Sequence, residues 1–262
     1  MIANPVRQTL LAGGTAFGTM AFEFFTPGLA RILASAGAEY VILDQEHSGA
    51  GIDTIKAQCA LARGAGIVPM VRVPACDKDL ICPVLDAGAL GIMVPMVETP
   101  EQAAAMVQWC RYRPLGKRGL AFGLAHDDWH PNAPRPYMDA ANQAILTIAM
   151  IETAAGLQNV RRILATPGID IGWLGHFDLS DSLGITGDFT HPRFTTAEAD
   201  ILAAGRETNT PIGWLANDGA AAKAGIARGF RALCLSTDVG LLRAALTAEI
   251  TAARGPDGNR ET

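Results

Sequence analysis

The sequence predicts an α/β protein folded as a (β/α)8 barrel, the TIM-barrel fold. Short apolar runs alternate with longer Ala- and Leu-rich amphipathic stretches, and eight such pairs follow one another. Several apolar runs end in a charged residue, as expected of barrel strands whose carboxyl ends form one functional face. The length of 262 residues suits one such barrel. We therefore expect a single domain over residues 1–262, with 255–262 as a flexible tail.

Each predicted strand is a run of apolar residues that is long enough to be buried on both faces. The strands are predicted near 16–20, 40–44, 68–72, 91–95, 146–151, 170–174, 211–215 and 232–235. The helices that follow them are predicted near 27–37, 52–64, 78–88, 100–111, 154–165, 196–208, 218–228 and 239–253, with an extra N-terminal helix over 4–12. A doubly wound open sheet would give the same alternation. No G-x-G-x-x-G motif opens a helix after the first strand, which weakens that alternative.

One long segment, residues 112–145, interrupts the alternation. A connection of this length usually serves as a lid, a binding loop or an oligomer contact. His126 and His130 within it have a spacing that resembles a pair of metal ligands. Pro131 and Pro134 argue against a helix that presents both side chains, so we favour a solvated loop.

The composition excludes several classes of protein. A formal net charge of −5 without a Lys/Arg-rich run argues against a nucleic-acid partner. The chain has no signal-like N-terminus and no apolar run that could span a membrane, which favours a soluble cytoplasmic protein. The five cysteines form no C-x-x-C pair, so no zinc site or disulfide framework is evident.

The segment Asp44-Gln45-Glu46-His47 directly follows the apolar run over 40–43. Charged groups at the end of a buried strand are costly to desolvate unless they bind something. His47 is a candidate general base, because its usual pKa is near neutrality and a carboxylate can orient it. Arg72 ends the next strand and could clamp a carboxylate or enolate oxygen, or form an ion pair with Asp44 or Glu46 at the barrel rim.

Glu152 and Asp178 each follow a predicted strand, so a barrel would bring both carboxylates to one rim. Two carboxylates and substrate oxygens suit a hard divalent cation such as Mg²⁺ or Mn²⁺. The alternative is that Glu152 starts a helix and Asp178 caps one. Around Gly175, glycines precede this second helix start, where free backbone N–H groups could hold a substrate carboxylate.

With these residues in view, the chain resembles the HpcH/HpaI aldolases, a family of class II, metal-dependent pyruvate aldolases. The resemblance spans nearly the whole chain, and six motifs in the same order carry it. The motifs are Asp44-x-Glu46-His47, Val71-Arg72-Val73-Pro74, Val94-Pro95-Met96-Val97, Gly116-x-Arg118-Gly119, Ile151-Glu152-Thr153 and Gly175-x-x-Asp178-Leu179-Ser180.

The resemblance implies a TIM barrel that assembles into a homo-oligomer, often a hexamer built as a trimer of dimers that swap the last helix. It implies that Glu152 and Asp178 hold the divalent metal ion, Mg²⁺ or Mn²⁺ and possibly Co²⁺. A 2-oxo acid such as pyruvate would chelate that metal. Phe177 and Asp178 would offer backbone N–H groups to the substrate carboxylate.

The resemblance also assigns the acid–base residues. Arg72 would stabilise the enolate oxygen, and His47 would move protons through a water at the metal. Asp86 from a neighbouring subunit would orient His47, with Asp44 and Glu46 as its close support.

The lysines support the metal-dependent mechanism independently. Cleavage of a C–C bond next to a 2-oxo acid leaves an enolate, which needs a Schiff-base lysine or a Lewis acid as its electron sink. The only lysines stand at positions 56, 78, 117 and 223, and none falls on a predicted strand. The sink is therefore expected to be a metal ion.

Three departures from the family pattern bear on the substrate. Met150 replaces a glutamine that contacts the oxo acid, and His176-Phe177 replaces a Pro-Ala step beside Asp178. Trp214 is bulky on the strand expected to border the acceptor pocket. We expect Phe177 and Trp214 to narrow the pocket toward small aldehydes.

The function expected from these residues is reversible retro-aldol cleavage of a 4-hydroxy-2-oxo acid to pyruvate, or a related 2-oxo acid, and an aldehyde. The same enolate chemistry could instead decarboxylate oxaloacetate or condense its enolate with an electrophile, as in a citrate-synthase-like reaction. A non-catalytic ligand-binding barrel is the third alternative. The costly set of Glu152, Asp178, Arg72 and His47 argues against it.

Overall fold

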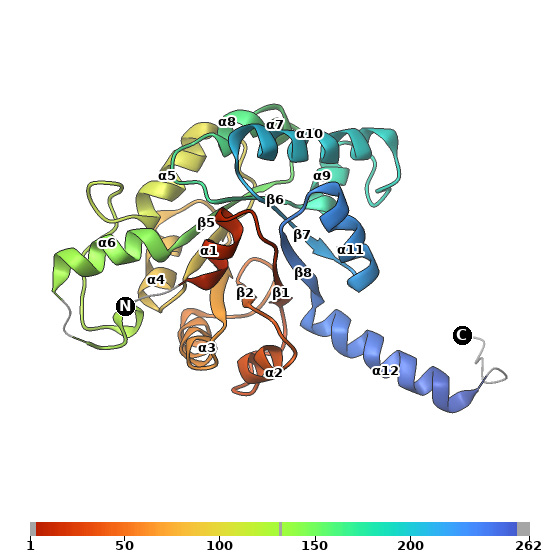
Figure 1. Ribbon diagram of the computed structural model, residues 1–262, viewed down its shortest axis with the longest axis horizontal. Helices are drawn as coiled ribbons and strands as arrows, with labels where there is room; N and C mark the ends of the chain where they lie inside the picture. Colours follow the sequence, from red (N-terminus) through yellow and green to blue (C-terminus); the bar gives the residue numbers. More distant parts are fainter. Residues whose placement is uncertain (1–3, 131–132, 256–262) are drawn as a thin grey trace.

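The computed structural model describes residues 4–130 and 133–255 and forms a closed, parallel, eight-stranded barrel in which strand order follows the sequence (Figure 1). The predicted (β/α)8 architecture is confirmed. The strands are β1 (Ala16–Ala21), β2 (Tyr40–Asp44), β3 (Val68–Arg72), β4 (Gly91–Val94), β5 (Leu146–Ile151), β6 (Ile171–Leu174), β7 (Ile212–Ala216) and β8 (Ala232–Thr237).

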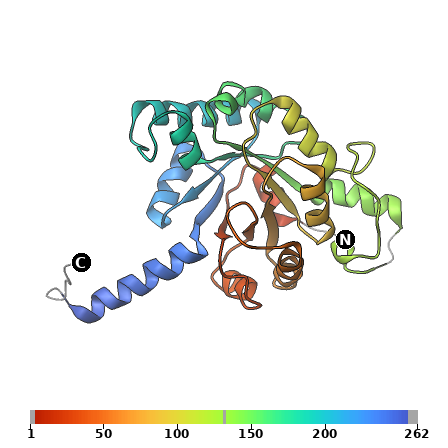
Figure 2. The same cartoon turned by 180° about the vertical axis from the view of Figure 1, so that it is seen from behind.

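Helices follow the strands and surround most of the barrel, as Figures 1 and 2 show from opposite sides. The α-helices are α1 (Pro5–Leu11), α2 (Leu29–Ser35), α3 (Ile52–Gly64), α4 (Lys78–Asp86), α5 (Pro100–Cys110), α6 (Pro134–Ala144), α7 (Ala154–Gln158), α8 (Val160–Leu164), α9 (His176–Ser182), α10 (Pro192–Thr208), α11 (Gly219–Arg228) and α12 (Asp238–Arg254). None of the helices in the described ranges is long and apolar enough to cross a membrane.

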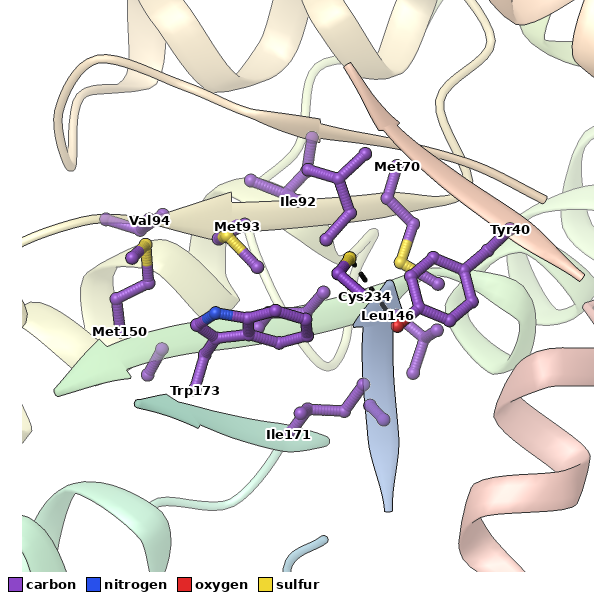
Figure 3. Packing of buried hydrophobic residues seen from close by; sticks show 14 of the residues in the cluster. Tyr40, Met70, Ile92, Met93, Val94, Leu146, Met150, Ile171, Trp173 and Cys234 are labelled. Atoms are coloured by element: carbon purple, nitrogen blue, oxygen red, sulfur yellow. Dashed lines mark hydrogen bonds between the residues drawn. The ribbon is translucent and has the colours of Figure 1, made fainter. Parts of the chain in front are cut away.

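The barrel interior is filled by large side chains, among them Tyr40 and Trp173 (Figure 3), and glycines of neighbouring strands lie against these two rings. A Cβ atom on Gly213 would lie 2.1 Å from the Trp173 ring, and one on Gly18 would lie 2.5 Å from the Tyr40 ring. Both rings are buried almost completely. Because interiors are close-packed, these glycines are what allow aromatic rings inside the barrel. The interior is therefore a solid core below the site.

The predicted N-terminal helix is confirmed as α1, which covers the amino end of the barrel. The side-chain amide of Asn4 donates to the carbonyls of Leu90 and Ala144 at 3.0 and 2.8 Å. Asp170, directly before β6, accepts from Arg7 and from Arg111, each at 2.7 Å. Two arginines thus share one buried carboxylate at the amino end of the barrel. In a (β/α)8 barrel the functional face is the opposite one, at the carboxyl ends of the strands.

The segment over 112–145 is more ordered than the sequence suggests. It contains a 3-10 turn at Ala125–Asp127 and the helix α6. The interpretation of a solvated loop is wrong for His126, which is buried at 4% exposure and packs edge-on against Tyr137 of α6. It holds for His130, which is exposed. Pro134 lies in the first turn of α6, where proline is compatible with a helix start, so it does not prevent the helix.

The last helix, α12, projects away from the barrel instead of packing along it (Figures 1 and 2). Asp238 at its first position is the only residue of the helix that is buried. Leu242 and Leu246 are 56% and 55% exposed. The chain therefore leaves an amphipathic helix without a covered apolar face.

Candidate active site

The end of β2 is held to the end of β3 by a buried ion pair. Asp44 is fully buried, and its Oδ1 accepts from Nε of Arg72 at 2.5 Å. Nη1 of Arg72 lies 3.0 Å from Oε2 of Glu46. Nη2 of Arg72 is buried and has no hydrogen-bond partner among the described residues. Arg72 is thus an immobilised cation, not an exposed rim residue, with one N–H edge left for another ligand.

His47 lies beside this ion pair, in a turn organised by Asp44. Oδ2 of Asp44 accepts from the backbone N–H of His47 at 2.7 Å. The His47 imidazole is 59% exposed, and its Nε2 lies 3.9 Å from Glu46. Burial raises the pKa of Glu46, and the positive charge of Arg72 and the nearby His47 act in the opposite direction. The His47 imidazole therefore lies open to solvent at the edge of the site, beside Glu46.

Asp86 does not reach His47 within the chain. It is the last residue of α4, and its Oδ1 accepts from Nη2 of Arg118 at 2.7 Å. Because barrel helices run opposite to the strands, the end of α4 lies toward the amino end of the barrel, away from the site. Contact between Asp86 and His47 would require a second subunit.

Glu152 follows β5 and is almost fully buried, at 2% exposure. The backbone N–H of Met96 donates to its Oε1 at 2.6 Å, from a residue with a φ of +52°. A Cβ atom on Gly175 would lie 2.2 Å from its Oε2, so this glycine makes room for the carboxylate. Burial, together with the negative charges of Glu46 and Asp178, raises the pKa of Glu152 to about 7, against the opposing hydrogen bond from Met96. The roles of Met96 and Gly175 toward Glu152 depend on contacts between residues far apart in the sequence, and their sequence signals are the Val94-to-Val97 motif for Met96 and the Gly175-to-Ser180 motif for Gly175.

Asp178 lies in the first turn of α9 and is exposed. His176 and Phe177 precede it, and their rings stack at 4.7 Å. The His176 ring also packs edge-on against Phe189. Burial lowers the pKa of His176 to about 4, so the imidazole is neutral at neutral pH. An aromatic wall therefore stands beside the Asp178 carboxylate.

These side chains share one cavity of about 450 Å³ at the carboxyl ends of the strands. It brings together predicted site residues from four strand ends, those of β2, β3, β5 and β6, with side chains that the sequence did not single out. The predicted ones are His47, Arg72, Met150, Glu152, Gly175, His176, Phe177 and Asp178; those not singled out include Phe22, Trp173, Asn217, Ser236, Thr237 and Arg243. Asp44 and Glu46 reach the cavity only through Arg72.

The structure corrects the placement of Trp214. It is not among the cavity-lining residues, because on β7 it is the neighbouring Leu215 that lines the cavity. The Trp214 ring packs on Phe230 at 5.3 Å and under the guanidinium of Arg228. Side chains alternate along a strand, so Trp214 faces the surrounding helices. Trp173 on β6 is the tryptophan of the cavity.

None of the four lysines lies on a barrel strand. Lys56, Lys78 and Lys223 are on helices, and Lys117 is in the segment before η1. The cavity therefore holds no amine for a Schiff base among its lining residues.

Comparison with known proteins agrees with this arrangement. The model of the HpcH/HpaI aldolase/citrate lyase family matches residues 21–245. A hydroxypyruvate/pyruvate aldolase of Chromohalobacter salexigens is 35% identical over 253 residues, which cover 96% of this chain and 98% of the relative. A 2-keto-3-deoxy-L-rhamnonate aldolase of Klebsiella pneumoniae is 32% identical, over 94% of this chain and 91% of the relative.

Among solved structures, an HpcH/HpaI aldolase from Desulfitobacterium hafniense has a TM-score of 0.90 at 30% identity, over 97% of this chain and 98% of that chain. The citrate synthase SbnG has a TM-score of 0.85 at 28% identity, over 95% of this chain and 96% of that chain. The region matched by the family model, residues 21–245, includes the carboxyl end of every barrel strand and leaves out only the first residues of β1. The chain belongs to the HpcH/HpaI aldolase/citrate lyase family.

Proposed function

We propose that the chain is a metal-dependent aldolase that cleaves a 4-hydroxy-2-oxo acid to pyruvate, or a related 2-oxo acid, and an aldehyde. The observation that carries this proposal is the cavity that combines the immobilised Arg72 with the carboxylates of Glu152 and Asp178. The aldolase names of relatives that are more than 30% identical support it over a citrate-synthase-like condensation.

The residues present fit a divalent cation. Glu152 is buried near the like charges of Glu46 and Asp178, an arrangement that a cation would relieve. Carboxylate oxygens are the ligands that Mg²⁺ and Mn²⁺ prefer, and Mg²⁺ usually takes one or two carboxylates with water and substrate oxygens. Glu152 and Asp178 would hold the ion. When bound, it supplies a Lewis acid for the negative charge that develops on the oxo acid.

The chain's own residues account for the other steps. The free Nη2 edge of Arg72 is placed to donate to the enolate oxygen, which is charged only as the C3–C4 bond breaks. His47, with Glu46 beside it, takes up the proton of the C4 hydroxyl as the aldehyde leaves. Transfer of that proton from His47 to C3 of the enolate then gives the 2-oxo acid and restores His47. The backbone N–H groups of Phe177 and Asp178 would hold the substrate carboxylate.

We also propose that the chain works as a homo-oligomer that exchanges α12 between subunits, within a hexamer of three dimers. An apolar stripe on α12 is exposed. A hollow of about 130 Å³ lies between β1, α2 and the first turns of α12, lined by Phe17, Leu33 and Leu241 among others. Burying the stripe against another subunit would remove both apolar surfaces from water.

An assay of pyruvate release tests the aldolase proposal. Purified protein is given a panel of 4-hydroxy-2-oxo acids after exhaustive chelation, and then with Mg²⁺, Mn²⁺ or Co²⁺ added back. We expect activity to vanish on chelation and to return with the cation. Full activity in the chelated protein would rule out the metal-dependent mechanism.

A further inference from the structure

The cavity has an apolar floor below the charged groups of its rim. Side chains two positions apart on a strand face the same way, so Met150 on β5 lies one layer below Glu152. Met150 is 4% exposed and lines the cavity. It pairs in register with Trp173 on β6, and Figure 3 shows the two side chains next to each other. With Met20 of β1 and Leu215 of β7, which also line the cavity, these two residues form what we call the cavity floor.

An aromatic ring continues this apolar surface beside Arg72. Phe22 directly follows β1, two residues after Met20, and lines the same cavity. The guanidinium carbon of Arg72 lies 5.5 Å from the centre of the Phe22 ring. The guanidinium therefore has carboxylates at two of its nitrogens and an aromatic face, while Nη2 is left for a ligand. The apolar surface thus extends from the cavity floor up to the side of Arg72.

The two hydroxyl groups of the cavity, on Ser236 and Thr237 of β8, are directed at α12. The Oγ1 atom of Thr237 accepts from the backbone N–H of Gly240 at 3.0 Å. A Cβ atom on Gly240 would lie 2.3 Å from the Oγ atom of Ser236, so this hydroxyl also lies against the first turn of α12. Neither hydroxyl is therefore directed at the cavity floor.

The amide and the uncharged ring of the cavity lie at its rim. Asn217 is exposed and stands two residues beyond Leu215, about 7 Å farther along the strand direction. His176 stands three residues beyond Trp173, and its ring packs against Phe189 at 5.1 Å. The cavity floor itself therefore offers no hydrogen-bonding side chain among the described lining residues.

One part of a bound oxo acid would have to meet this floor. Its carboxylate and keto oxygens belong on the polar side of the cavity, with Arg72, Glu152 and Asp178. C4 and its hydroxyl must face His47, which is open to solvent at the edge of the site. C3 carries two further atoms or groups. Because the mouth of the cavity is taken by C4, these substituents would lie toward the cavity floor.

We propose that the cavity floor selects oxo acids whose C3 carries only hydrogen or a small alkyl group, and disfavours those with a hydroxyl at C3. Met150, directly below Glu152, is the specificity-determining residue. A hydroxyl buried on this floor would lose its hydrogen bonds to water without gaining others. An alkyl group would instead meet methionine side chains, which adapt to its shape. The proposal rests on the aldolase function and names the class of oxo acid that the same site takes.

Exchange of the C3 protons with deuterated water tests the proposal, because this half-reaction needs no aldehyde. A C3 proton leaves, its electron pair moves into the enolate, and a deuteron from the solvent takes the proton's place. Pyruvate, 2-oxobutanoate and hydroxypyruvate are compared by NMR with saturating metal. Each rate is divided by the rate with the metal ion alone, which corrects for the different acidity of the C3 protons.

We expect the corrected kcat/KM of the wild-type protein for pyruvate and 2-oxobutanoate to agree within about tenfold, and that for hydroxypyruvate to be about 10–100-fold lower than that for pyruvate. Met150→Gln adds an amide to the cavity floor and should raise the ratio of hydroxypyruvate to pyruvate by about tenfold or more. Met150→Leu, the apolar control, should keep the wild-type order.

Equal use of hydroxypyruvate and pyruvate by the wild-type protein would overturn the proposal, and this comparison needs no variant to fold. An unchanged ratio in a Met150→Gln protein that still exchanges pyruvate would overturn the role of Met150. Absence of exchange with all three acids in wild-type protein would instead overturn the aldolase function itself.

Discussion

Arg72 combines a structural and a chemical task in one side chain. Its Nε and Nη1 atoms bind Asp44 and Glu46, while Nη2 is left for a ligand. Lysine has the same charge but not the planar fork that makes these contacts together. The substitution Arg72→Lys therefore separates the two tasks.

We predict that Arg72→Lys lowers kcat about 100-fold, because the enolate oxygen loses a fixed donor. The affinity for Mn²⁺, followed by calorimetry, should change less than about threefold, since the carboxylates of Glu152 and Asp178 remain. Arg161→Lys, in an exposed ion pair with Glu207, is the control. Parallel losses of turnover and metal affinity would mean that Arg72 only supports the barrel rim.

Glu152 makes the metal-free protein sensitive to pH. Its pKa in the folded protein is raised from 4.5 to about 7, so the folded state holds the proton more tightly than the unfolded state does. The resulting stability is fully present below pH 4.5 and is lost as the pH rises through 7. The loss is about 3 kcal/mol, at 1.36 kcal/mol for each unit of pKa.

We predict that Glu152→Gln, without metal, matches wild type in its free energy of unfolding at pH 5 and exceeds it by up to about 3 kcal/mol at pH 8. Gln can still accept from Met96. Urea unfolding in the presence of a chelator measures this, with the exposed helix variant Glu101→Gln as control. The same difference at both pH values would contradict a buried, proton-binding Glu152.

At the scale of elements, Asp170 joins three parts of the barrel. It accepts from Arg7 of α1, from Arg111 after α5 and from the backbone of Thr147 on β5. We predict that Asp170→Ala lowers the free energy of unfolding by about 3–5 kcal/mol, because it leaves two arginines without their counter-charge. Asp139→Ala, which removes an exposed i,i+4 pair with Arg135, should cost less than about 0.5 kcal/mol.

The apolar stripe of α12 gives a prediction about assembly. Leu246→Glu places a charge on an exposed residue, so the subunit should fold normally. The same charge would be desolvated if α12 packs on another subunit. We therefore expect the Leu246→Glu variant to have a smaller molar mass in size-exclusion chromatography with light scattering. The control Leu11→Glu, at an exposed residue of α1, should leave the molar mass unchanged. An unchanged oligomer would contradict the exchange of α12.

Elements with strong periodicity were predictable from sequence, and the irregular ones were not. The strands start and end within two residues of the prediction, because each is a continuous apolar run between polar boundaries. The helix α6 was missed because Pro131 and Pro134 were interpreted as helix breakers, although Pro134 occupies the first turn of α6. The predicted helix over 154–165 is two helices that meet at Asn159.

At the scale of the whole molecule, the sequence located the strand ends but not the depth of each side chain. Because the carboxyl ends of barrel strands share one rim, the sequence predicted that Arg72, Glu152 and Asp178 lie close together. The three side chains line one cavity. Trp214 was misplaced, since a one-residue shift along a strand reverses the side-chain direction. Arg243 was not considered, because its helix begins only after the last strand has closed the barrel.

The role proposed for Asp86 would make the assembly part of the active site. Asp86 binds Arg118 at the end of α4, while His47 is exposed at the opposite end of the barrel. If Asp86 orients His47 of a neighbouring subunit, the two residues of one chain serve different sites. A chain with His47→Ala and a chain with Asp86→Asn would then each be inactive alone but could complete one another.

We predict that co-expression of the two variants with different affinity tags yields mixed oligomers with up to about a quarter of wild-type activity, since half of the sites hold an intact His47 and half of their neighbours an intact Asp86. Asparagine retains an acceptor for the buried Arg118, so the subunit should still fold. Co-expression of two His47→Ala chains is the control and should remain inactive. A mixed oligomer no more active than the average of its parents would mean that Asp86 serves Arg118 alone.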